Sequence, residues 1–164
     1  MLITSEKQHQ NIDKLVFIDQ KLRKLDLNPI AYKLIDSGWN HEQTVRGIAQ
    51  YMMFLSLIHL YPNLSLVPSS EIDQVWHFHI LDTAKYAQDC QMLFGYFVHH
   101  FPYWGIENTE DREIAFMQTQ QLLAKHFTTE VFDQSQTLSA CKLIIHEELQ
   151  RPSCDISAAY SLLS

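Results

Sequence analysis

The chain has 164 residues, of which 46% are hydrophobic, and its formal net charge is −7 with histidine counted as neutral. This length fits one domain, and the apolar fraction is enough to build a core without disulfide bonds. The acidic balance argues against a protein that binds nucleic acid by neutralising phosphates, and against docking on an anionic membrane surface.

The cysteines and the apolar runs point to a cytoplasmic protein. Cys90, Cys141 and Cys154 form no CxxC pair, which is typical of free thiols in a reducing compartment. The first residues, MLITSEKQHQNIDKL, lack the basic and apolar regions of a secretory signal peptide. The most apolar stretch, YMMFLSLIHLY at residues 51–61, is too short to span a bilayer and predicts a buried helix. We therefore expect no membrane segment.

The first third of the chain predicts three helices. Apolar residues recur at intervals of three and four from residue 5 to about residue 25, which is one amphipathic face. After the break at DLNP, a short helix is expected over about residues 30–37, with Gly38 as the glycine that follows its C-terminus. Asn40 is predicted to cap a long helix over residues 41–60.

The rest of the chain also shows helical signals. Ser70 with Asp73 three residues later resembles a capping box, and Asp82-Thr83 is a second start signal for a helix closed by Gly95. Alternation is too short to build a sheet, although SLV and EVF are candidate short strands. We predict an all-α fold, a single compact domain of about six to eight helices over residues 1–164. The later helices are expected in EDREIAFMQTQQLLAKHF, capped by Asn108 or Thr109, in SACKLIIHEELQ and in ISAAYSLL.

The stretch SSEIDQVWHFHILD, residues 69–82, contains unusually many titratable groups for an apolar run. On a helix, Asp73 and His77 lie one turn apart on the same flank, whereas His79 shares the face of Trp76. His77 and His79 then point about 160° apart, so they cannot hold one ion unless the helix unwinds after His77. We predict that His77 faces a polar site and that His79 points into the packing.

A hairpin at Asp82-Thr83 would bring the next helix, and the loop after Gly95, back against this flank. A carboxylate, a thiolate and two imidazoles suit tetrahedral zinc, whereas two imidazoles and a carboxylate with open positions suit non-haem iron. Zinc is the first choice and iron the second. The predicted metal ligands are Asp73, His77, Cys90 and His99, and the supporting groups or alternative ligands are His79, Tyr86 and His100.

A plainer interpretation accounts for the same residues. Asp73 would cap its helix with Ser70, His79 would be a core histidine bonded to a carbonyl, and Cys90 would be a small buried hydrophobe. The chain would then be an interaction module in which the histidines and Asp73 form a structural hydrogen-bond network. The aromatic segment GYFVHHFPYWG would be its binding surface for a protein or a small molecule. The sequence does not decide whether the domain is an enzyme.

One stretch resembles a known family. Residues 72–105 contain Asp73, Trp76, His77 and His79 as D-x-x-W-H-x-H, followed by Y-x-x-x-C, F-G and a histidine. This pattern is similar to the glycine-rich-domain-protein-like family, a domain of unknown function in plant and bacterial proteins. The resemblance covers about residues 39–127, although the chain lacks the glycine-rich extensions of the plant members and has methionine at residues 52 and 53, where the family often has a basic residue. It implies that these titratable residues form one metal or small-ligand site, and it names no activity.

Overall fold

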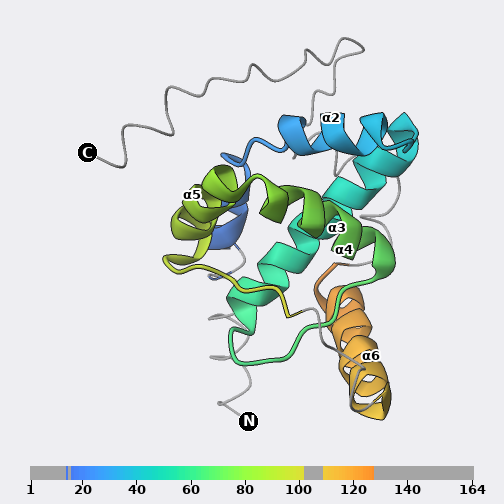
Figure 1. The fold of residues 1–164 in the computed structure, drawn as a ribbon. Helices are drawn as coiled ribbons and strands as arrows, with labels where there is room; N and C mark the ends of the chain where they lie inside the picture. Colours follow the sequence, from blue (N-terminus) through green and yellow to red (C-terminus); the bar gives the residue numbers. More distant parts are fainter. Residues whose placement is uncertain (1–13, 15, 102–108, 128–164) are drawn as a thin grey trace.

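The fold is all-α, as predicted. The computed structural model describes residue 14, residues 16–101 and residues 109–127 of the chain, and those ranges contain no strand. The helices are α2 (Asn28–Asp36), α3 (His41–Leu60), α4 (Ser70–Leu81), α5 (Thr83–Phe94) and α6 (Thr109–His126), preceded by helical residues at 16–22 (Figure 1). The helices expected in SACKLIIHEELQ and ISAAYSLL, the candidate strand EVF and Asn108 lie outside the described residues. The single domain over residues 1–164 stays a prediction.

Local capping signals place most of the helix ends. The Asn40 side chain accepts a hydrogen bond from the Gln43 N–H at 2.8 Å, which satisfies a donor that the first turn of α3 leaves free. Gly38 and Gly95 follow α2 and α5 with φ of +105° and +79°, a conformation that costs other residues much more than glycine. These predicted ends are confirmed. By contrast, the helix before α2 ends at residue 22, short of residue 25.

Helix α3 forms the centre of the core. Tyr51, Phe54 and Leu57 on α3 are completely buried, because α2, α4 and α6 all pack against this helix. Figure 1 shows α3 running diagonally through the molecule, with α4 beside it and α5 following α4 after the break at Asp82. Helix α4 packs on α3, and α5 packs on α4, so the predicted second helix start at Asp82-Thr83 is confirmed.

The apolar run at residues 51–61 belongs to this core. Only His59 and Tyr61 in it are more than slightly exposed. No helix in the described part of the chain has the length and hydropathy needed to cross a bilayer. The cytoplasmic location stays a prediction.

Gly47 gives a first test of this packing. A Cβ atom at Gly47 would lie 2.6 Å from Cζ3 of the buried Trp39 ring. Overpacking costs about 1–3 kcal/mol, which exceeds the roughly 0.5–1 kcal/mol that alanine gains over glycine inside a helix. We expect Gly47→Ala to lower the free energy of unfolding by about 1–2 kcal/mol in urea titrations. Gln91→Ala, at an exposed position of α5, is the control and should change little. A Gly47→Ala protein at least as stable as wild type would show that Trp39 shifts without cost.

Candidate metal centre

Asp73 is not used to cap its own helix. The N-cap of α4 is Ser69, whose Oγ accepts from the Ile72 N–H at 3.4 Å, and Ser70 is already helical. The predicted capping box of Ser70 with Asp73 is therefore wrong by one residue. Asp73 Oδ1 instead accepts a hydrogen bond from His100 Nε2 at 2.8 Å. The carboxylate is thus directed to a segment that follows α5, outside its own helix.

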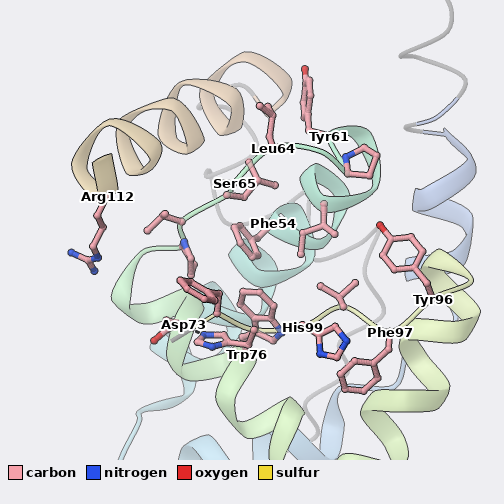
Figure 2. A pocket seen from close by; sticks show the side chains of 18 of the residues that line it. Phe54, Tyr61, Leu64, Ser65, Asp73, Trp76, Tyr96, Phe97, His99 and Arg112 are labelled. Carbon is pink, nitrogen blue, oxygen red and sulfur yellow. Dashed lines mark hydrogen bonds and ion pairs between the residues drawn. The ribbon is translucent and has the colours of Figure 1, made fainter. Parts of the chain in front are cut away.

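Asp73 lies in the wall of a groove of about 840 Å³. Its apolar wall is formed by Phe54 and Ile58 of α3 and by Trp76 of α4. Arg112 reaches the groove from α6. Figure 2 shows Arg112 and Asp73 toward one end of the groove and Tyr96 and Phe97 toward the other. The groove therefore has a charged end and an aromatic end.

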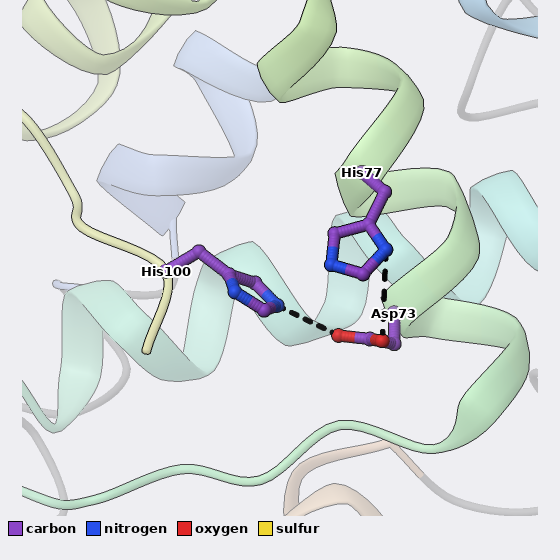
Figure 3. A group of neighbouring side chains, drawn as sticks. All are labelled: Asp73, His77 and His100. Carbon is purple, nitrogen blue, oxygen red and sulfur yellow. Dashed lines mark hydrogen bonds and ion pairs between the residues drawn. The ribbon is translucent and has the colours of Figure 1, made fainter. Parts of the chain in front are cut away.

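His77 and His100 gather around Asp73 at the charged end. His77 Nδ1 lies 3.8 Å from Asp73 Oδ2, and the two residues are one turn apart on α4. Each of the three residues offers a ligand atom, and these atoms all lie within 4.8 Å of one another (Figure 3). The rings of His77 and His100 are 4.6 Å apart between centroids. Two imidazoles and one carboxylate therefore lie close enough together that they could hold one ion.

The group is open on one side and supported on the other. The His77 side chain is 52% exposed and that of His100 only 15%. The Trp76 ring meets the His100 ring at 70° with 4.6 Å between centroids, which fixes the imidazole against α4. Three such donor groups on one side would leave coordination positions of an ion free on the other, as in catalytic zinc sites and non-haem iron sites.

Two of the four predicted ligands are not part of this group. Cys90 is 2% exposed, and burial raises the pKa of its thiol, although hydrogen bonds with Val98 and Tyr86 oppose the shift. A neutral buried thiol is a poor metal ligand. His99 is exposed and its ring packs on Phe97 at 4.9 Å. In this arrangement His100 takes the place predicted for His99.

His79 lies in the core and makes two side-chain hydrogen bonds. It is 1% exposed. Its Nδ1 lies 2.9 Å from the Tyr51 hydroxyl, and its Nε2 lies 2.8 Å from Asp89 Oδ2. Helix α4 stays regular through Leu81, so His77 and His79 point apart as predicted. The expected carbonyl partner is wrong, because Tyr51 and Asp89 occupy both ring nitrogens.

Asp89 was missed by the sequence analysis. Its Oδ2 also pairs with Lys85 Nζ at 2.8 Å. The signal that would have found it is the i, i+4 spacing of Lys85 and Asp89 on α5.

Tyr86 connects α4 to the segment that contains His100. The Trp76 indole N–H donates to the Tyr86 hydroxyl at 2.9 Å, and that hydroxyl donates to the Val98 carbonyl at 2.6 Å. Burial raises the pKa of Tyr86, so the hydroxyl stays protonated and available as a donor. Tyr86 is therefore a positioning residue, because it holds Val98, which lies two positions before His100, and it contributes no atom to the Asp73–His77–His100 group.

Comparison with known proteins places the chain in a family. A family model described as UCP032817-like matches residues 7–138. The chain belongs to the UCP032817-like family. No curated protein and no solved structure matches it. The resemblance to the glycine-rich-domain-protein-like family is wrong, because the match found is to the UCP032817-like family and nothing supports the other one.

The UCP032817-like match includes every element of the site. Helices α3 to α6 and the segment with His100 all lie between residues 7 and 138. The Asp73–His77–His100 group and the whole groove are therefore part of the family domain. The family description names no ligand or reaction, so function has to be inferred from the group and the groove.

Proposed function

We propose that this UCP032817-like protein binds a divalent transition-metal ion through Asp73, His77 and His100. The observation that supports the proposal is the convergence of three ligand atoms within 4.8 Å of one another. Imidazole nitrogens and a carboxylate oxygen are the donors that zinc and iron(II) take in proteins. This set differs from the predicted one, in which Cys90 and His99 took the place of His100.

Zinc is the first metal to test and iron(II) the second. Sites with nitrogen and oxygen donors generally bind Zn²⁺ more tightly than Fe²⁺. Asp73 and His100 also form part of the groove wall, so an ion held by them would face the groove. There it would act as a Lewis acid toward a bound molecule, or lower the pKa of a bound water. The proposal that the ion has a catalytic role rests on its position facing the groove, where a bound molecule could reach it.

Metal affinity tests the proposal directly. Untagged protein is equilibrated with Zn²⁺, passed through a desalting column and assayed for zinc per chain, and its affinity is measured by competition with a chromogenic chelator. We expect close to one zinc per chain, and a loss of affinity of at least about 100-fold in His77→Ala, because one of three ligands is removed. Zinc should also raise the melting temperature of the wild type.

His99→Ala is the matched control for the metal experiment. It removes a neighbouring exposed imidazole that packs on Phe97 and lies outside the group. The variant should bind zinc as the wild type does. Less than about 0.2 zinc per chain in the wild type, or equal losses in the two variants, would exclude the proposed site.

An interaction module is the second candidate function. It is favoured by the exposure of three aromatic residues beside the groove, since Tyr96, Phe97 and Phe101 are 46%, 45% and 58% exposed. Aromatic residues at this density are typical of interface anchors. Under this alternative the Asp73–His100 hydrogen bond only fixes the segment against α4. The protein would then contain no metal, and His77→Ala would leave partner binding unchanged.

A further inference from the structure

We propose that the groove binds a small organic monoanion, a carboxylate attached to a flat or extended apolar body, with its carboxylate at Arg112. The inference deepens the proposed function, because it names the class of ligand that binds in the groove faced by the ion. It rests on the proposed function only for a reaction at the metal. Recognition of the anion depends on Arg112 and the groove walls alone.

The dimensions and the walls of the groove suit a small molecule. Its volume of about 840 Å³ lies within the range of small-molecule sites, about 300–1,000 Å³. Phe54 is completely buried and Trp76 is 6% exposed, so one wall is rigid and apolar. Tyr96 and Phe97 add aromatic surface at the end away from Arg112 (Figure 2). An apolar body of one ring or a short chain would lie along this wall.

Arg112 supplies the charge that selects an anion. Of the three arginines in the described ranges, Arg23 pairs with Asp19 and Arg46 with Glu71. Arg112 forms no ion pair or hydrogen bond within those same ranges, although the chain has a net charge of −7. A guanidinium presents a planar fork of donors that matches a carboxylate with two parallel hydrogen bonds.

In the metal-free protein, the form in which binding is measured, the charge balance at this end favours one negative charge over two. Asp73 lies in the same wall and its carboxylate repels a second anion nearby. One guanidinium neutralises one carboxylate, whereas a dianion such as a phosphate monoester would leave a negative charge beside Asp73. A ligand with one carboxylate and an apolar body therefore fits both ends of the groove.

Isothermal titration of the full chain tests the inference with matched probes. The probes are 4-phenylbutyrate and its uncharged amide, together with hexanoate and hexanamide, added to EDTA-treated protein. We expect each acid to bind at least about tenfold more tightly than its amide, because only the acid forms the charge-assisted pair with Arg112. Arg112→Gln should remove this preference. Arg46→Gln, which lies outside the groove, should keep it.

Two results would overturn the inference. Equal binding of acid and amide in both pairs would show that the groove does not select an anion. An unchanged acid affinity in an Arg112→Gln protein that retains the wild-type melting temperature would show that the anion is bound elsewhere.

A further variant separates this inference from the metal site. His77 is a member of the metal group but not of the groove wall. His77→Ala should therefore lose zinc and keep the preference for the acid. Zinc binding without acid selection would contradict the groove inference alone, and acid selection without zinc binding would contradict the metal site alone.

Discussion

Trp76→Ala is expected to lower the free energy of unfolding by about 3–5 kcal/mol, the usual cost of removing a large buried aromatic side chain. Trp76 shares the buried face of α4 with His79 and is 6% exposed. Its ring packs on Phe54 with 5.3 Å between centroids, at the contact between α3 and α4. Alanine would leave a cavity there, and it would also remove the indole N–H that donates to Tyr86.

Chemical denaturation followed by far-UV circular dichroism measures this loss. Trp76→Phe is the matched variant, because it keeps a buried aromatic ring and most of the buried volume while it removes the N–H donor. It should cost about 1–2 kcal/mol, the range for one lost buried hydrogen bond and a smaller ring. If Trp76→Ala lost less than about 1 kcal/mol, the tryptophan would contribute to binding in the groove rather than to the core.

The features that the sequence predicted well depend on interactions within a few residues. Asn40 bonds an N–H three residues ahead, and Asp82 bonds the Lys85 N–H in the same way. Gly38 and Gly95 need only their own φ angles to end a helix. The opposite directions of His77 and His79 follow from the helical repeat alone. Such features can be read from a short window of sequence.

The features that the sequence did not give depend on how distant segments pack. His79 meets Tyr51, a residue 28 positions away, because α3 and α4 cross there. Asp73 meets His100 across 27 positions, and a shift of one residue in that segment would have presented His99 instead. No local pattern fixes that register, because residues 97–100 belong to no helix or strand whose repeat would assign each side chain a direction.

The family assignment fails for a related reason. The resemblance rested on a few residues around one helical hairpin, Asp73, Trp76, His77 and His79 above all. Some of these residues have structural roles, since Trp76 fills the core and His79 completes a buried hydrogen-bond network. A short pattern with such a role can recur in different families. The UCP032817-like match over residues 7–138 includes the packing helices as well, and it is therefore the more specific evidence.

Asp89→Ala is expected to be the most damaging change at a charged residue. The Asp89 side chain is 14% exposed, and its Oδ2 accepts hydrogen bonds from His79 Nε2 and Lys85 Nζ, each at 2.8 Å. The Tyr51 hydroxyl bonds the other nitrogen of His79, and burial raises the pKa of Tyr51 far enough to keep it protonated. Alanine at position 89 would leave the buried Nε2 without an acceptor. We expect a loss of about 2–4 kcal/mol near neutral pH, somewhat below the cost of breaking a fully buried pair.

The stability lost in Asp89→Ala should depend on pH, because the Asp89 carboxyl titrates. Burial alone would raise its pKa, but the hydrogen bonds from His79 and Lys85 outweigh burial and hold the pKa below its ordinary value. A depressed folded-state pKa stabilises the protein above the unfolded-state pKa of about 3.9, and this stability is lost as the pH falls through the folded value. The difference in the free energy of unfolding between wild type and Asp89→Ala should therefore narrow below about pH 4.

Urea titrations near pH 7 and near pH 3 measure this difference at both ends of the change. Asp19→Ala, which removes an exposed pair with Arg23, is the control and should cost less than about 1 kcal/mol. A gap of the same size at both pH values would show that Asp89 stabilises the fold by packing alone.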